Sequence, residues 1–306
     1  MSIKNILLTQ DIDQARSFTC KPFTHFDFTE AQKLASRIGD YVTLLNGNFI
    51  DFLKELHTLG EVVAVTGNNH CKVEHIGVYR NISFEGDTSF LYGNEMDLQF
   101  FLPQWKFGFA VDENDRLSFQ FFDKSGRAVH KIFLTEYSTR SAWFRLMALY
   151  KTKEKKYAAT GIQDFFYTAK NHIAFNTIPP LPEIAGFVKQ VNNNTLENIL
   201  FQCTVQNIAV KLIVANHGCT QLYNGMIQNL QQTNSFYKVI GHNMNMRLQR
   251  MAIADSYIVR MPVKNGVMSY LEIFGEDGNR VLRLRGKQNA DGTESTGWTN
   301  ILRHLS

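Results

Sequence analysis

The most informative group of charged residues lies in the segment RVLRLRGK near the end of the chain. Arg283, Arg285 and Lys287 alternate with other residues, so on an extended strand their side chains leave the same face. Three neighbouring cations repel each other unless water or an anion compensates them. Two interpretations stay open: an exposed strand face, or a cationic wall that receives carboxylates. Arg260 and Lys264, on the preceding hairpin, would extend such a wall.

The histidines and cysteines are scattered, which disfavours a preassembled metal site. His70 and His75 lie five residues apart on a predicted strand, and that spacing puts them on opposite faces. His172 lies on a helix-like segment, where it is either a surface residue or a ligand. The four cysteines form no Cys-x-x-Cys pair, which argues against structural zinc and favours a reducing compartment.

Composition is typical of a globular protein. The chain has 306 residues, of which 44% are hydrophobic and 20% charged, with a net charge of +4. That length suggests two domains, and the weak positive charge suits small acidic ligands, with no nucleic acid expected as a partner. The N-terminal residues lack the apolar run of a secretory signal. No stretch approaches the ~18 apolar residues of a membrane span, so a cytoplasmic location is expected.

An internal repeat divides the chain. Four positions recur after 148 residues: Cys71 as Cys219, Gly77 as Gly225, Asn81 as Asn229 and Met96 as Met244. The segment FDKSGRAV recurs as FGEDGNRV after 152 residues, and Trp143 recurs as Trp298 after 155. The sequence therefore predicts a duplication. The halves are residues 1–150 and 151–306, and they meet at the charged run KTKEKK.

Hydrophobic periodicity predicts an α+β fold in which each half is an antiparallel β-sheet meander flanked by helices. Alternating, β-branched segments predict strands, with a turn at residues 67–69 and a DKSG hairpin signal. Helices are expected over residues 29–45, 48–60, 141–151, 195–203 and 297–305. The PPLP segment at 179–182 marks a connector.

Several motifs resemble a known family. The segments GNEMDLQFFLPQWKFGFAV and LSFQFFDKSGRAVHKIFL look like the first half of the HemS/ChuS/PhuS type of cytoplasmic haem protein, the hemin-degrading factor family. VANHGCTQLYNG and VMSYLEIFGEDGNRVLRLRGK are similar to its second half. Residues from about 50 to 305 follow the family pattern, and the family's own tandem duplication accounts for the repeat.

The resemblance implies one haem bound between the halves, with an iron-ligand histidine from the second half and a distal arginine from the first. At these places the chain carries Gln163 and Gln99. Haem iron is held in proteins by His, Cys, Met or Tyr, so a glutamine amide is a weak ligand by comparison. His172 is the candidate substitute, but in a helix it lies about two and a half turns beyond Gln163, on the opposite side.

The resemblance also implies polar and cationic contacts to the haem propionates. The family's propionate lysine falls on Met261, and its other propionate contacts fall on Arg283, Arg285 and Gln288. The two arginines add positive charge, which suits two carboxylates. Arg247 replaces a family histidine in the second half.

Three functions remain open: a haem-binding and trafficking protein of haem-iron utilisation with altered iron ligation, a haem-degrading enzyme, or a binding module for another anion. Haem is the expected ligand. A haem oxygenase or an inner-membrane haem transporter is the expected protein partner. The candidate haem-binding residues are Gln163, Gln99, Arg283, Arg285, His172 and Arg260.

Overall fold

A computed structural model describes residues 28–93, 96–152 and 187–304. Gln163, His172 and the PPLP connector lie outside the described residues. In the described ranges, no helix is long and apolar enough to cross a membrane.

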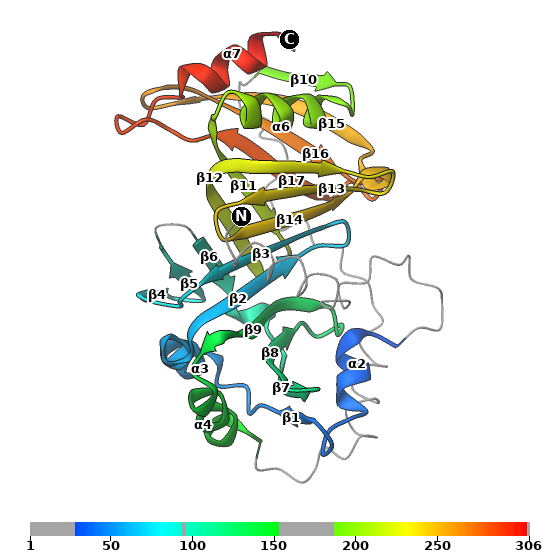
Figure 1. Ribbon diagram of the computed structural model, residues 1–306, viewed down its shortest axis with the longest axis vertical. Helices are drawn as coiled ribbons and strands as arrows, with labels where there is room; N and C mark the ends of the chain where they lie inside the picture. Colours follow the sequence, from blue (N-terminus) through cyan, green and yellow to red (C-terminus); the bar gives the residue numbers. More distant parts are fainter. Residues whose placement is uncertain (1–27, 94–95, 153–186, 305–306) are drawn as a thin grey trace.

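The strands of the described residues form one continuous antiparallel sheet of 17 strands, which the long strand β12 (Cys219–Gln232) divides into two sheets that both contain strands from each half (Figure 1). The first sheet has the order β1 (Val42–Leu44), β7 (Phe107–Glu113), β8 (Arg116–Phe122), β9 (Ala128–Ser138), β2 (Gly60–Gly67), β3 (Cys71–Gly77), β14 (Met244–Gln249) and β13 (Phe236–Gly241). The second has the order β10 (Phe187–Val191), β15 (Asp255–Val263), β16 (Gly266–Phe274), β17 (Arg280–Gly286), β11 (Ala209–Ala215), β12 (Cys219–Gln232), β6 (Met96–Phe101), β5 (Thr88–Leu91) and β4 (Ile82–Glu85).

The two halves exchange strands at the centre of the molecule. Strand β6 of the first half pairs with β12 of the second, with Phe100 opposite Cys219. Strand β14 of the second half pairs with β3 of the first, with Leu248 opposite Cys71. The long strand β12 joins the sheets, because its later residues pair with β13. Each half therefore completes the sheet of the other half.

Helices pack at the two ends of the molecule (Figure 1). The first half contributes α2 (Glu30–Ala35), α3 (Phe49–Glu55), η1 (Leu56–Leu59) and α4 (Arg140–Tyr150), and the second contributes α6 (Thr195–Val205) and α7 (Thr296–His304). Short 3-10 turns, η2 (Leu102–Gln104) and η3 (Arg250–Ala252), follow β6 and β14. Both sheets and all these helices confirm the predicted duplicated α+β fold.

The repeated tryptophans anchor the last helix of each half. Trp143 of α4 is buried, and its indole N–H donates to the Ser118 carbonyl at 3.3 Å. Trp298 of α7 is also buried and donates to the Ser269 carbonyl at 3.2 Å. The repeat seen in the sequence is thus reproduced in side-chain packing and hydrogen bonding.

One predicted helix is shorter than expected. The pattern predicts a helix over 29–45, but α2 ends at Ala35 and is followed by strand β1. Gly39 has a φ of +101°, which is unavailable to a right-handed helix and reverses the chain. Val42 and Thr43 are β-branched and pair with β7, so sheet formation overrides the local helical pattern.

Candidate functional site

Three of the predicted site residues project from one face of the second sheet. Arg283 is paired with Ile213 on β11, Ile213 with Leu222 on β12, and Leu222 with Asp97 on β6. Directly paired residues project to the same side of a sheet, as do residues two apart along a strand. Arg285 and Gln99 therefore share the side of Arg283. We call this surface, formed by Gln99, Lys211, Arg283 and Arg285 with their neighbours, the arginine face.

Arg283 is held in a fixed orientation by two neighbours on β16. Its Nε donates to Oε1 of Glu272 at 2.6 Å, and its guanidinium carbon lies 4.8 Å from the centre of the Tyr270 ring. The side chain is 24% exposed, so the guanidinium group is accessible without being free in solvent. An arginine that is already oriented loses little conformational freedom when it binds a carboxylate.

Glu272 is the residue of this site that sequence reasoning missed. The carboxylate is buried, and its second oxygen lies 2.5 Å from Nε of Arg280. Burial raises the pKa of Glu272 despite the opposing charges of Arg280 and Arg283. Burial likewise lowers the pKa of Arg280 to about 10. The only sequence signal was the alternation of Tyr270 and Glu272 on the strand before RVLRLRGK.

Arg285 lies beside a second cation. It is directly paired with Lys211 on β11, and burial lowers the pKa of both groups. Lys211 Nζ is 3.8 Å from a carboxylate oxygen of Asp97. The charged groups of this region are four cations and three carboxylates: Arg280, Arg283, Arg285, Lys211, Glu272, Asp97 and Glu294. Their net charge of +1 leaves an excess of positive charge, which suits an acidic ligand.

Aromatic side chains continue the arginine face next to Gln99. Phe90 on β5 is directly paired with Gln99. Its ring is stacked on Tyr92, with centroids 5.7 Å apart and an interplanar angle of 4°. Tyr92 is 65% exposed, so the stack offers an open, flat apolar surface. Cations at one end and aromatic rings at the other suit a ligand that is flat, apolar and acidic at one edge.

The expectation that Arg260 extends the cationic wall is wrong. Arg260 is paired with Ser269 on β16, one residue out of phase with Tyr270, so it projects to the opposite face of the sheet. There its guanidinium carbon lies 5.5 Å from the centre of the Phe187 ring. Met261 takes the place of Arg260 on the arginine face. Lys264 lies in the turn between the two strands.

The structure does not place the predicted iron ligands, because Gln163 and His172 lie outside the described residues. Within residues 28–93, 96–152 and 187–304, no cluster of histidine, cysteine, aspartate or glutamate side chains could hold a metal ion. Gln288 donates to the Gly292 carbonyl at 2.8 Å in the loop after β17. Arg247 lies on β14, in the first sheet.

Comparison with known proteins agrees with this architecture. The model of the haemin-degrading HemS.ChuX domain matches the chain twice, over residues 27–150 and 182–305. The hemin transport protein HmuS of Yersinia pestis is 28% identical over 318 residues, which cover 92% of this chain and 91% of HmuS. The hemin transport protein HemS of Yersinia enterocolitica is also 28% identical, with the same coverage.

Solved structures show the same fold. Apo-PhuS, a haem-binding protein from Pseudomonas aeruginosa, superimposes with a TM-score of 0.80 at 21% identity and covers 98% of both chains. ChuS, an E. coli haem oxygenase, superimposes with a TM-score of 0.77 at 24% identity, covering 91% of this chain and 93% of ChuS. With two matched domains that span most of its length, the chain belongs to the haemin-degrading HemS/ChuX family.

Proposed function

We propose that this protein binds haem on the arginine face and carries it within the cytoplasm as part of haem-iron utilisation. The observation that carries the proposal is the placement of Gln99, Arg283 and Arg285 on one face of a sheet that spans both halves. The hemin transport names of the curated relatives support haem as the ligand. The cysteines Cys71, Cys203 and Cys219 are buried and scattered over both halves, which is consistent with a reducing compartment.

The described residues fit the outer parts of a haem. Arg283 and Arg285 would hold the two propionates, because guanidinium groups form strong paired hydrogen bonds with carboxylates. The stacked rings of Phe90 and Tyr92 would contact the apolar part of the macrocycle. Gln99 would approach the same surface from β6 with an uncharged amide.

Carriage is favoured over degradation by the residues at the two reactive positions. Gln99 offers no positive charge to stabilise a developing negative charge near the iron. Gln163 would be a weaker iron ligand than histidine. Haem degradation is the second candidate function, favoured by the match to a haemin-degrading domain on both halves. A carrier of this kind would deliver haem to a haem oxygenase or receive it from an inner-membrane haem transporter.

A hemin titration tests the proposal. We expect a saturable shift of the Soret band with one hemin per chain. Arg285→Gln should weaken hemin binding about tenfold to a hundredfold, the effect of one charged hydrogen bond. Arg260→Gln is the matched control, because it removes the same charge from the opposite face of the same sheet and should leave hemin affinity unchanged.

Two results would overturn the proposed site or ligand. Equal affinities for wild type, Arg285→Gln and Arg260→Gln would remove the arginine face as the hemin site. No Soret shift at micromolar hemin would remove haem as the ligand and leave another anion as the occupant. Bleaching of the Soret band under ascorbate, with appearance of a bilin product, would replace carriage with degradation.

A further inference from the structure

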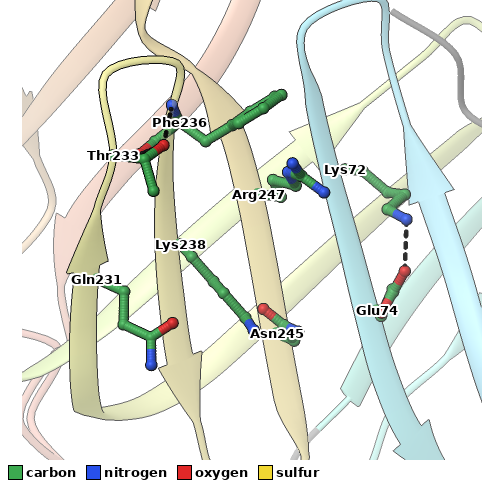
Figure 2. A pocket seen from close by; sticks show the side chains of 8 residues that line it. All are labelled: Lys72, Glu74, Gln231, Thr233, Phe236, Lys238, Asn245 and Arg247. Atoms are coloured by element: carbon green, nitrogen blue, oxygen red, sulfur yellow. Dashed lines mark hydrogen bonds and ion pairs between the residues drawn. The ribbon is translucent and has the colours of Figure 1, made fainter. Parts of the chain in front are cut away.

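The first sheet carries a separate pocket with a cavity of about 170 Å³ (Figure 2). Four adjacent strands contribute to it. The residues that line it are Lys72 and Glu74 from β3, Asn245 and Arg247 from β14, Phe236 and Lys238 from β13, Gln231 from β12 and Thr233 just after β12. We call this group the lysine-arginine pocket.

This pocket is the repeat counterpart of part of the arginine face. Arg247 follows Gln99 by 148 residues, the offset that relates the two halves, and Lys72 precedes Thr220 by the same number. In the second sheet Gln99 is paired with Thr220, and in the first sheet Arg247 is paired with Lys72. Lys238 is paired with Arg247 on its other side. Two uncharged positions of one sheet are therefore cations in the other.

The three cations lie in one row across adjacent strands, where neighbouring backbones are about 4.8 Å apart. The guanidinium carbon of Arg247 lies 3.7 Å from the centre of the Phe236 ring, which supports the arginine from one side. Lys72 is only 13% exposed, and its Nζ lies 2.6 Å from the Glu74 carboxylate. Figure 2 shows Lys238 reaching from β13 towards Asn245.

The pocket has an excess of positive charge. Glu74 compensates one of the three cations through its contact with Lys72, which leaves a net charge of +2. Among the described residues, no carboxylate forms an ion pair with Arg247 or Lys238. Like charges on adjacent strands cost free energy unless an anion lies between them.

A buried polar group in the same pocket also lacks a partner. Asn245 is 5% exposed, and among the described residues its Oδ1 has no hydrogen-bond partner. Leaving such a group unsatisfied costs about 1–3 kcal/mol, so buried amides normally have partners. The Asn245 amide lines the cavity, where a bound ligand would be in reach.

We propose that the lysine-arginine pocket is a second ligand site, which binds a phosphate-sized dianion. A hydrogen phosphate ion has two negative charges for the net charge of +2. It also has oxygens for Arg247, Lys238 and Lys72, and a hydroxyl that can donate to Asn245. The cavity is smaller than the ~300–1,000 Å³ typical of sites for drug-sized ligands. The ligand is therefore a free phosphate or the phosphate group of a phosphomonoester.

Titration of the full chain with inorganic phosphate, followed by calorimetry at low ionic strength, tests this site. A parallel titration with glycerol 3-phosphate distinguishes a free ion from a phosphomonoester, and saturable binding of either one supports the proposal. Arg247→Gln gives the pocket the residue of the counterpart position, and it should weaken phosphate binding at least tenfold. Lys238→Gln should weaken binding in the same direction.

The controls separate this site from the arginine face. Arg285→Gln should leave phosphate affinity unchanged while it weakens hemin binding, and Arg247→Gln should leave hemin affinity unchanged. No saturable binding of either probe up to about 10 mM would overturn the proposal, because that concentration corresponds to less than about 3 kcal/mol of binding free energy. Equal phosphate affinity in wild type and Arg247→Gln would also overturn it, whatever the outcome of the hemin titrations.

Discussion

The imidazole Nε2 of His217 lies 2.7 Å from a carboxylate oxygen of Asp123, which ties the turn before β12 to the β8–β9 turn of the other half. The repeat produces a related contact in which His70 of the first half lies near Asp277 of the second half. Burial raises the pKa of Asp277, but hydrogen bonds from Asn279 and the charge of His70 have the larger effect, so the pKa is lowered. Each half thus places the histidine of one turn against the aspartate turn of its partner half.

Asp123→Asn should destabilise the junction between the halves. Burial raises the pKa of Asp123. The hydrogen bond and charge of His217, together with hydrogen bonds from Ser125 and Arg127, have the larger effect and lower the pKa below its ordinary value of 3.8. A carboxylate with a lowered pKa stabilises the fold above its unfolded pKa, and this contribution is lost as the pH falls through the folded pKa. We expect Asp123→Asn to lower the unfolding free energy by about 2 kcal/mol at pH 7.

Urea unfolding at pH 7 and near pH 3 measures this effect. The difference between Asp123→Asn and wild type should shrink at the lower pH, because the stabilising contribution of the Asp123 carboxylate decreases below pH 3.8. Asp115→Asn is the control, because the Asp115 side chain is 98% exposed. Equal losses for the two variants would contradict a specific role of the His217–Asp123 contact.

His75→Leu should stabilise the protein, and more strongly in mild acid. His75 is buried, and among the described residues neither ring nitrogen has a hydrogen-bond partner. Burial, aided by the charge of His242, lowers the pKa of His75 from 6.5 to about 4. As the pH falls below 6.5 the unfolded state binds the proton first, so stability decreases by about 1.4 kcal/mol per pH unit until the folded pKa is reached.

The variant removes both this pH dependence and the unpaired nitrogens. We expect the unfolding free energy to rise by about 1 kcal/mol at pH 7 and by more at pH 5. His130→Leu is a contrasting control: the ring of His130 contacts the hydroxyls of Tyr79 and Thr66 at 2.5 and 2.8 Å, so its removal should destabilise the protein at pH 7. A His75→Leu variant with the acid sensitivity of wild type would refute this account.

The sequence predicts the local features of this fold well and the long-range pairings poorly. Alternation and the turn at Gly67 define the β2–β3 hairpin, because both signals lie within a few residues of the strands they specify. Nothing local indicates that Phe100 lies opposite Cys219 in the exchanged strands. That pairing depends on the packing of the two halves, which strand propensity does not encode.

The site shows the same limit. The shared face of Arg283 and Arg285 follows from a two-residue period within one strand, so it was predicted correctly. The side of Arg260 depends on its register with Ser269 across the hairpin, and a slip of one residue reverses the face. The contact between Glu272 and Arg283 likewise depends on the register of β16 and β17, near a bulge at Phe274.

Glu272→Gln should cost about 3–5 kcal/mol of unfolding free energy, because it leaves two arginines without their buried counter-charge. Arg280 is the more affected, since its side chain is only 5% exposed. The double variant Glu272→Gln/Arg280→Gln should recover part of the loss, because Arg283 alone can be hydrated. Denaturant unfolding of the three proteins measures the coupling, and a double variant no more stable than the single one would contradict it.

Gln99→Arg should strengthen hemin binding. The side chain is part-exposed on the arginine face, opposite Thr220 and next to Phe90, so an arginine there can reach a ligand without displacing the core. The added cation should lower the hemin dissociation constant about tenfold, which corresponds to about 1.4 kcal/mol. Gln206→Arg, at the exposed end of α6, adds the same charge away from this face and should leave hemin affinity unchanged. If the two variants strengthened hemin binding equally, the gain would reflect net charge, and Gln99 would have no direct contact with the ligand.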